Sequence, residues 1–423
     1  MQHLAKNMIP GDIELVDGLG IKVYDSNGRE YLDLTSQNLN LNLGHRHPTI
    51  VNSIRKLVNS DFPYYISPRY KNKYVETLAK RLTELAPEGL NKVNLHLCNG
   101  SDANEDGLKR ARKYNKDNNR RMIISFNGSY LGTSSETISA SGGNFHKEEC
   151  LGGSGNYIFI NPIRQDSLPA GMTLEEHIDY KIKEFEHLIE KRRDIAGIII
   201  ELVPFNAGIL VQPQEYVKNL ERICNENDIA MIVDEAQTAF GWCGDIFTSN
   251  IYEVRPDIIA LAKGMTAGFP ALAPTVFKEK YDVLNGGTSE NTFGAQTLGC
   301  VAALANIGYL TSSGIMKEVP EKHKRFMEHF KRMKERYSFV GNVKGLGLIL
   351  GMDFVYEDGK PDMNKSVDVY FSALKKGLII NVSTTEKGRQ NVISIKPPIT
   401  ISTTEIDDAM ECLDDALREY SRK

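Results

Sequence analysis

Short runs of apolar residues alternate with amphipathic stretches through the middle of this 423-residue chain. The runs rich in β-branched residues predict buried strands at 122–126, 197–201, 229–234 and 258–262. The stretch 217–227 has helical periodicity and predicts one of the intervening helices. Strands that are apolar on both faces are typical of a parallel sheet covered by helices on each side. The pattern therefore predicts an α/β fold with a mostly parallel central sheet.

The first part of the chain predicts a β-hairpin. Strand-like residues 21–24 and 31–34 flank a turn at 25–28, which contains Asn27 and Gly28. An Asn-Gly pair favours a tight hairpin because both residues tolerate positive φ.

The last part of the chain is more helical and more charged. It predicts a helix at 317–336, strands at 345–350 and 392–395, and a final helix at 404–420. We expect Thr403 or Thr404 to cap this final helix.

Together these patterns predict a large α/β domain and a smaller α+β domain built from both chain ends. We expect residues 1–60 to form the N-terminal part of the small domain, 61–310 the large domain, and 311–423 the C-terminal part of the small domain. The length agrees with a soft expectation of two to three units of about 150 residues each.

Composition narrows the class of protein. The chain is 41% hydrophobic and 25% charged with a net charge of −4, which is typical of an ordered, soluble protein. The balanced charge and the lack of a basic stripe argue against a nucleic-acid partner. No apolar run approaches the roughly 20 residues that a membrane span needs, so we expect no membrane partner.

The cysteines indicate the compartment. Six are scattered along the chain without a CxxC pair: Cys98, Cys150, Cys224, Cys243, Cys300 and Cys412. This spacing favours neither a disulfide framework nor a metal site. We therefore expect a reducing, cytoplasmic location.

Three chemical features fall where ligands bind in an open α/β sheet, at the carboxyl ends of the strands. Asp234 ends one predicted strand, and Lys263 follows another. The run 99–105 precedes a helical pattern at 107–111, so free backbone N–H groups at a helix start can bind an anion. Taken singly, each feature is more often structural. Taken together, they fit pyridoxal 5′-phosphate, which has a phosphate, a ring nitrogen that pairs with a carboxylate, and an aldehyde that reacts with a lysine.

At these residues the sequence resembles the class III, or ω-type, aminotransferases of fold type I, over nearly the whole chain. The segment 233–244 is similar to that family's Asp-Glu-(Val/Ala)-Gln signature, and Lys263 follows Asp234 by 29 positions, as the family's lysine does. The segment 100–105 resembles its phosphate loop, and 291–294 resembles the segment whose threonine reaches the neighbouring subunit's phosphate. Further landmarks are 43–48 and 396–400.

The resemblance implies roles for three residues in the chemistry. Lys263 would form a Schiff base with the cofactor and then carry the proton of a quinonoid intermediate. Asp234 would keep the ring nitrogen protonated, and Gln237 would hydrogen-bond the ring's phenolic oxygen. These are the expected catalytic and ring-binding groups.

The remaining cofactor contacts are also implied by the resemblance. Tyr130 would stack on one face of the ring and Ala236 would lie on the other. Gly100 and Ser101 would hold the phosphate, with Thr292 contributed by a second subunit. The implied assembly is a homodimer, or a dimer of dimers, with the active site at the interface.

Two departures from the family concern substrate recognition. Many members have a carboxylate-binding arginine where this chain has Ser394, and members that use 2-oxoglutarate often pair it with a glutamate where this chain has Asn206. The two absences agree, because a buried charge without its partner is costly. Lys396 is one candidate substitute, and Arg46 and Arg69 are others. Trp242 stands where the family often has arginine, and it either lines the site or packs.

These departures leave several readings open. The first is an aminotransferase that acts on an amine, an amino sugar or a distal amino group. The alternative is a racemase or epimerase of an amino acid or of its amide or lactam. A decarboxylating transaminase is less favoured, because its substrate-side glutamine would fall at Asn38, with Gln37 adjacent. A scaffold protein with a dead site is disfavoured because the cofactor residues are all retained.

Overall fold

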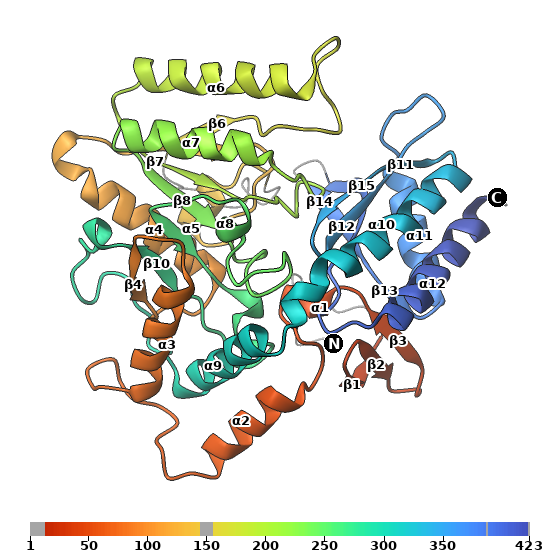
Figure 1. Ribbon diagram of the computed structural model, residues 1–423, viewed down its shortest axis with the longest axis horizontal. Coiled ribbons are helices and arrows are strands. Elements are labelled where there is room, and N and C mark those ends of the chain that lie inside the picture. The colour runs from red at the N-terminus through yellow and green to blue at the C-terminus, as the bar shows by residue number, and fades with distance from the viewer. Residues whose placement is uncertain (1–12, 144–154, 386–387, 422–423) are drawn as a thin grey trace, which may run out of the picture.

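The computed structural model describes residues 13–143, 155–385 and 388–421. A seven-stranded sheet forms its centre, with helices packed around it (Figure 1). In order across the sheet, the strands are β4 (Leu90–Asn94), β10 (Thr275–Lys278), β9 (Ile258–Ala260), β8 (Ala230–Asp234), β7 (Ile195–Ile200), β5 (Met122–Phe126) and β6 (Tyr157–Ile160). Neighbours are parallel except around β10, which is antiparallel to both β4 and β9. The prediction of an α/β fold with a mostly parallel central sheet is confirmed.

The four strands predicted from apolar runs are β5, β7, β8 and β9. Strand β9 ends at Ala260, two residues before its predicted end, and Lys263 begins a short 3-10 turn. Strands β4, β6 and β10 were not predicted. Two of them mix polar and apolar residues over only four or five positions, so their period is hard to recognise from sequence.

Alternate residues of the strands pack into separate layers on the two faces of the sheet. Ile198 and Ile200 lie in one buried cluster with side chains of α6 (Leu174–Lys191) and α7 (Gln214–Glu226). Ile199 lies in another cluster with α4 (Gly100–Tyr114). Helices therefore cover both faces, as the apolar strands predict.

The other helices before residue 313 surround this core. Helix α9 (Thr297–Ser312) is largely buried and packs against α2 (Pro48–Val58) and α3 (Lys73–Leu85). Three short helices complete this part: α1 (Ser36–Leu39), α5 (Ser135–Ala140) and α8 (Thr248–Ile251).

Both chain ends contribute to two smaller sheets. The first contains β1 (Leu15–Leu19), β2 (Lys22–Asp25), β3 (Glu30–Asp33) and β13 (Leu378–Ile379), and β13 pairs in parallel with β3. The second contains β11 (Val340–Leu346), β12 (Ile349–Phe354), β15 (Gly388–Ile395) and β14 (Asn381–Thr385). Around them lie α10 (Val319–Arg336), α11 (Met363–Lys375) and α12 (Thr403–Ser421). The small α+β part built from both ends is thus present, while the boundaries at 60 and 310 stay a prediction.

The expected strand at 345–350 is wrong. Strand β11 ends at Leu346 and β12 begins at Ile349, so Gly347 and Leu348 form the turn of a hairpin. Gly347 has φ +57°, and a Cβ there would lie 2.1 Å from the Trp242 carbonyl oxygen. An unbroken apolar run conceals this turn because glycine supplies the reversal without any polar residue.

Two local predictions need smaller corrections. The hairpin between β2 and β3 is present, but only Gly28 of the Asn-Gly pair has positive φ, and the Asp25 carboxylate accepts from the N–H groups of Asn27 and Arg29. At the final helix, Ser402 rather than a threonine is the cap: its hydroxyl accepts from the N–H of Glu405, whose carboxylate accepts from Ser402 N–H. This reciprocal pair is a capping box.

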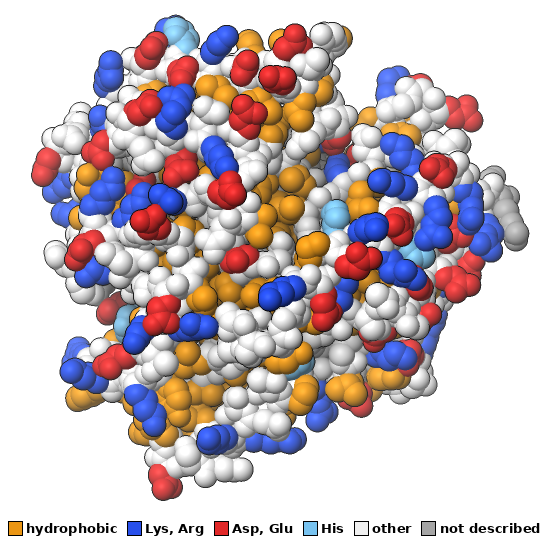
Figure 2. Space-filling model, viewed as in Figure 1, with side chains coloured by type: hydrophobic (Ala, Val, Ile, Leu, Met, Phe, Trp, Pro, Cys, Tyr) orange, Lys and Arg blue, Asp and Glu red, His pale blue; other side chains and the backbone are white. Residues whose placement is uncertain are grey.

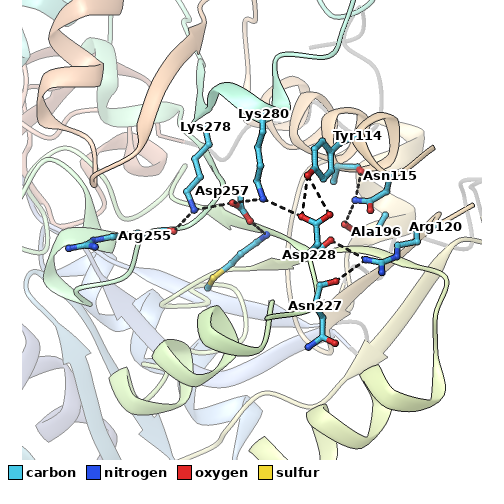
Figure 3. Close-up of polar contacts among 12 residues, drawn as sticks. Tyr114, Asn115, Arg120, Ala196, Asn227, Asp228, Arg255, Asp257, Lys278 and Lys280 are labelled. Atoms are coloured by element: carbon cyan, nitrogen blue, oxygen red, sulfur yellow. Dashed lines mark hydrogen bonds and ion pairs between the residues drawn. The ribbon is translucent and has the colours of Figure 1, made fainter. Parts of the chain in front are cut away.

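The amino ends of the parallel strands are joined by a polar network (Figure 3). Asp257 forms an ion pair with Lys278 Nζ at 3.0 Å and accepts from the N–H of Met231 at 2.9 Å. Asn115 donates to the carbonyl oxygen of Ala196 at 3.1 Å. This network fixes the strand starts at the end of the sheet opposite to Asp234.

The surface carries charges of both signs. On the face shown in Figure 2, acidic and basic side chains are interspersed and no basic stripe is visible. Within the described ranges, no single helix has the length and apolar composition to cross a bilayer. One pair bent by 60°, Thr297–Ser312 with Ile315–Arg336, meets that test only when both are taken together.

Candidate functional site

Asp234 and Lys263 lie at the carboxyl ends of neighbouring strands. Asp234 is the last residue of β8 and is paired in register with Ala260, the last residue of β9. Lys263 follows three residues later, and both side chains line one cavity of about 390 Å³, here called the first cavity. The structure therefore brings together the two groups that the sequence pattern predicts to be close.

Other predicted site residues line the same cavity. Its described lining includes Gly100, Ser101, Tyr130, Ala236 and Gln237. Thr292 is not among them. The first cavity thus combines a helix start, a carboxylate, an amine and an aromatic side chain.

The helix start is shaped to receive an anion. Helix α4 begins at Gly100, earlier than the helical pattern at 107–111 suggests, and the Asn99 side chain caps it by accepting from the N–H of Asp102 at 3.0 Å. No described residue accepts a hydrogen bond from the N–H of Gly100 or Ser101. Two donors and the positive end of the helix therefore face the cavity.

A loop closes tightly over this helix start. The Ser101 hydroxyl accepts from the N–H of Thr133 at 3.0 Å. Gly132 has φ +135°, and a Cβ there would lie 2.3 Å from Ser101 Oγ. Only glycine fits at this position without moving the serine.

Asp234 is buried, with 6% of its surface exposed. Its carboxylate accepts from the N–H of Ala236 at 2.8 Å and from Asn104 Nδ2 at 2.7 Å. Burial raises the pKa of Asp234, and the donors Asn104 and Ala236 together with the charge of Lys263 offset this only in part. A cationic partner in the cavity would relieve that cost and favour the ionised form.

Asn104 is a site residue that the sequence analysis missed. Besides Asp234, its Nδ2 donates to the carbonyl oxygen of Leu131 at 2.8 Å. It therefore connects α4, the end of β8 and the loop after β5. The sequence analysis placed Asn104 in the run before the helical pattern, and no local signal pointed to its partner Asp234.

Glu201 is a second group that was missed. It follows β7, is 4% exposed, and accepts from the backbone N–H of Tyr130 at 3.0 Å. Burial and then repulsion from Asp234 raise the pKa of Glu201 to about 8. Glu201 therefore holds the backbone of the predicted stacking residue and tends to keep a proton at neutral pH.

Lys263 has an unusual backbone and a perturbed amine. Its φ is +45°, a left-handed value that is rare for a side chain of this kind. Asn306 Nδ2 donates to the carbonyl oxygens of Gly264 and Met265, at 2.8 and 2.9 Å, and so holds the turn. Burial lowers the pKa of Lys263, with Asp234 and Glu201 opposing that effect in part. A lysine with a lowered pKa is more often a neutral nucleophile.

Trp242 packs and is not among the described residues that line the first cavity. It is fully buried, its indole N–H donates to the Pro397 carbonyl oxygen at 3.0 Å, and a Cβ on Gly264 would lie 2.5 Å from its ring. Trp242 thus supports the Lys263 turn from behind.

Lys396 contacts Trp242 and the Gln237 backbone. Its ammonium donates to the Gln237 carbonyl oxygen and lies 3.7 Å from the centre of the Trp242 ring. Burial, followed by the charge of Lys263, lowers the pKa of Lys396 well below its usual value. Lys396 is therefore committed to protein groups, and the structure does not favour it as a carboxylate ligand.

The two departures from the family lie away from the cavity lining. Ser394 is fully buried on β15, and its hydroxyl has no hydrogen-bond partner among the described residues. Neither Ser394 nor Asn206 is among the described residues that line the first cavity, and the same holds for Arg46 and Arg69.

A second cavity, of about 510 Å³, meets the first at Lys263, Asn99 and Gly100. Its other wall carries the amide side chains of Gln37, Asn38 and Asn40. This second cavity is therefore the open space next to the Lys263 side chain.

The amide wall is built on a left-handed turn. Four consecutive residues have positive φ: Ser36 (50°), Gln37 (45°), Asn38 (58°) and Leu39 (69°). Such a conformation costs about 1–2 kcal/mol for each residue other than glycine, so other contacts must hold it. Strain of this kind clusters at functional sites.

Asp33 holds the left-handed turn. This fully buried carboxylate accepts from the backbone N–H and the side-chain Nε2 of Gln37, from Thr35 and from His45 Nε2. Burial alone would raise the pKa of Asp33, but the hydrogen bonds from His45 and Thr35 outweigh it and lower the pKa. His45 therefore has a structural role, and no group of metal-binding side chains is found in the part of the chain that the structure describes.

Thr292 lies on the surface. Its carbonyl oxygen accepts from the Tyr65 hydroxyl at 3.0 Å, and the exposed ring of Phe293 lies edge-on to Tyr65. The preceding Asn291 donates to the Asp102 carboxylate at 2.6 Å. The segment is thus tied to the start of α4, and Thr292 is exposed and is not among the described residues that line the first cavity.

Comparison with known proteins gives consistent matches over the whole chain. A family model described as aminotransferase class-III matches residues 4–417. An acetylornithine aminotransferase of Caldanaerobacter subterraneus subsp. tengcongensis is 32% identical over 413 residues, which cover 96% of this chain and 95% of the relative. A leucine/methionine racemase of Thermococcus litoralis is 29% identical over 427 residues, which cover 98% and 93%.

A solved structure matches equally fully. It is an amine transaminase from an uncultivated Pseudomonas species in its PLP-bound form, with a TM-score of 0.90 and 24% identity, and the match covers 99% of this chain and 97% of that one. At this identity the likeness supports the fold.

Proposed function

Because this chain belongs to the class III aminotransferases, a pyridoxal 5′-phosphate-dependent family, we propose that it transfers an amino group from an amine, an amino sugar or a distal amino group, using Lys263. The observation that carries the proposal is that Lys263, Asp234 and the start of α4 line one cavity. The absence of the usual arginine at Ser394 supports a donor that is not recognised through an α-carboxylate.

The residues of the first cavity fit the cofactor. The free N–H groups of Gly100 and Ser101 suit its phosphate, and the buried Asp234 carboxylate suits a protonated ring nitrogen. Tyr130 and Ala236 provide surfaces for the two faces of a flat ring. When bound, the cofactor supplies an electron-accepting ring and an aldehyde that takes up the amino group.

In this proposal the chain's own residues hold the cofactor in position and transfer protons. Lys263 is the amine that would hold the cofactor through its aldehyde, and once free it would serve as the general base and acid of the site. Asp234 keeps the proton on the ring nitrogen, and Asn104 keeps Asp234 in place. Gln237 is proposed to bind the phenolic oxygen, while Glu201 holds the Tyr130 backbone.

We propose in addition that the protein forms a homodimer, or a dimer of dimers, in which Thr292 completes the partner's phosphate site. The exposed position of Thr292 beside Tyr65 and Phe293 supports this. Mixing a Lys263→Ala chain with a Thr292→Ala chain tests it, because one site of the hybrid then has both native residues. Activity should appear on mixing and would not appear if Thr292 served its own chain.

A cytoplasmic location is also proposed. Five cysteines in the described part of the chain are free, as in a reducing compartment. Cys150 lies outside the described residues.

Racemisation is the second candidate. The 29% identical leucine/methionine racemase favours it, as does the lack of the arginine at Ser394. A racemase returns the proton to the opposite face of the same carbon and needs no acceptor.

One experiment separates the candidates. The cofactor-loaded protein is given amines, amino sugars and amino acids without an acceptor, and its visible absorbance band and any carbonyl product are followed. An aminotransferase loses the band and releases a carbonyl, whereas a racemase keeps the band while optical rotation decays. The Lys263→Ala variant should fold normally and do neither, and retained activity in it would contradict the proposal.

A further inference from the structure

Hydrogen bonds fix the orientation of two amide side chains that line the second cavity. Asn40 Nδ2 donates to the carbonyl oxygens of Gln37 and Asn38, at 3.1 and 3.2 Å. A carbonyl oxygen can only accept, so Asn40 must present its NH₂ group to these oxygens. Its own amide oxygen then has no described partner and is available to the cavity.

Gln37 is oriented by the same logic. Its Nε2 donates to the Asp33 carboxylate at 3.2 Å, and an ionised carboxylate can only accept. The lowered pKa of Asp33 keeps it ionised. The Gln37 amide oxygen is thereby left without a described partner, like that of Asn40.

The free N–H of Gly100 and the amine of Lys263 are donors that this cavity shares with the first, where they are proposed to bind the cofactor. Two other polar side chains of the lining are engaged within the protein. Asn99 uses both ends of its amide on Asp102, and the Thr266 hydroxyl donates to the Phe269 carbonyl oxygen at 2.9 Å. The Asn38 amide, which makes no hydrogen bond to a described residue, is the exception and can donate or accept.

Fixed charge is scarce around the cavity. Among its described lining residues, Lys263 is the only basic side chain and none is acidic. Leu41, Phe269 and Leu272 provide an apolar wall. A carboxylate, which carries only acceptors, would meet the amide oxygens of Gln37 and Asn40 here, with the Asn38 amide as the one uncommitted side-chain donor among the described lining residues, so its lost hydration would be poorly replaced.

We propose that the second cavity selects donors that carry an uncharged hydrogen-bond donor, a hydroxyl or a primary amide, next to the reacting amine. The acceptor oxygens of Gln37 and Asn40 bind that group, and Asp33 and the left-handed turn hold them in place. This inference rests on the proposed aminotransferase function and names the substrate class of the same site.

Matched donors test the selection. Without any acceptor, the cofactor-loaded protein is mixed with an amino acid, its primary amide or its amino alcohol. Each of the three is tested with the side chain of alanine, of leucine and of phenylalanine. The second-order rate of loss of the visible band is measured for every donor. For the side chain that gives the fastest reaction, the amide or amino alcohol should react at least tenfold faster than the amino acid.

Two variants assign the effect to the amide wall. Asn40→Leu removes one acceptor and should reduce the advantage of the uncharged donors at least fivefold. Asn38→Asp leaves the described hydrogen bonds intact, suits a left-handed residue, and adds negative charge, so it should slow the amino acid at least threefold more than its amide. Asn118→Asp, an exposed change before β5 at the other end of the sheet, should leave the ratio unchanged.

The outcomes are distinct. Amino acids that react as fast as their amides, or a ratio insensitive to Asn38→Asp, would overturn the selection while leaving the aminotransferase proposal intact. If the visible band persists with all nine donors and with the wider panel described above, the proposed function itself is refuted.

Discussion

Replacing Asn104 with leucine tests whether a buried amide holds the catalytic carboxylate. The side chains have similar volumes, and the change removes both donors to Asp234 and Leu131. A hydrogen bond to a charged group contributes about 1.5–3 kcal/mol, and a buried carbonyl left unpaired costs about 1–3 kcal/mol. We therefore expect the free energy of unfolding to fall by about 3–5 kcal/mol.

The same change should weaken cofactor binding. Without the Asn104 donor, the pKa of the buried Asp234 rises further, because that donor is one of the groups opposing the effect of burial. Less of the ionised carboxylate is then present to pair with the ring nitrogen. We expect the Kd for pyridoxal 5′-phosphate to rise at least tenfold, which corresponds to about 1.4 kcal/mol.

A matched control separates these two effects. Asn115 is also fully buried and donates to two carbonyl oxygens, those of Ala111 and Ala196, at the far end of the sheet (Figure 3). Asn115→Leu should lower stability in urea unfolding and leave the cofactor Kd within twofold of native. If Asn104→Leu costs less than about 1 kcal/mol, or changes the Kd no more than the control does, the reasoning about Asp234 is refuted.

Three further changes probe other parts of the site. Burial raises the pKa of Glu201 to about 8, so in cofactor-free protein its contribution to stability is present below about pH 4.5 and is lost as pH rises through 8. Glu201→Gln should remove about 2–3 kcal/mol of the decline in unfolding free energy between pH 6 and 9; parallel pH curves for the two proteins would contradict this. Gly132→Ala puts a methyl carbon 2.3 Å from Ser101 Oγ and should raise the Kd for the cofactor at least tenfold by titration, whereas Gly155→Ala, whose added carbon meets no described atom within 4 Å, should not. Ser394→Ala deletes a buried hydroxyl without a described partner and should change unfolding stability by less than about 1 kcal/mol in either direction with native donor rates; a large loss of rate would mean that Ser394 contacts substrate.

The site residues that could be predicted from sequence lie at or just after the ends of strands whose apolar pattern is clear. Runs such as 229–234 predict a buried strand, and Asp234 at its end is thereby placed at the carboxyl edge of the sheet. Lys263 could be predicted to lie at the same edge because the strand before it is equally apolar, and the structure shows that the two strands are neighbours.

The parts that were not predictable depend on contacts between distant residues. Asn104 meets Asp234 across 130 positions, and Glu201 meets Tyr130 across 71. No local pattern encodes such a pair. Lys396, one candidate carboxylate ligand, is a similar case: it lies just beyond the end of β15, and its ammonium contacts Gln237 and Trp242, which are distant in sequence.

The left-handed turn is a further case. Ser36, Gln37 and Asn38 have no strong preference against an ordinary turn, and none is a glycine that would signal positive φ. The conformation comes from Asp33 and His45, which meet the turn only in the folded chain. Its amide wall could therefore be found only from the structure.

The central claim is that Lys263 is the amine that engages the cofactor. The most direct measurement is borohydride reduction of the cofactor-loaded protein, followed by proteolysis and mass spectrometry of the labelled peptide. We expect the cofactor mass on the peptide that contains Lys263 and a loss of label in Lys263→Ala. Label on the other buried lysine near the site, Lys396, or no label at all, would contradict the account.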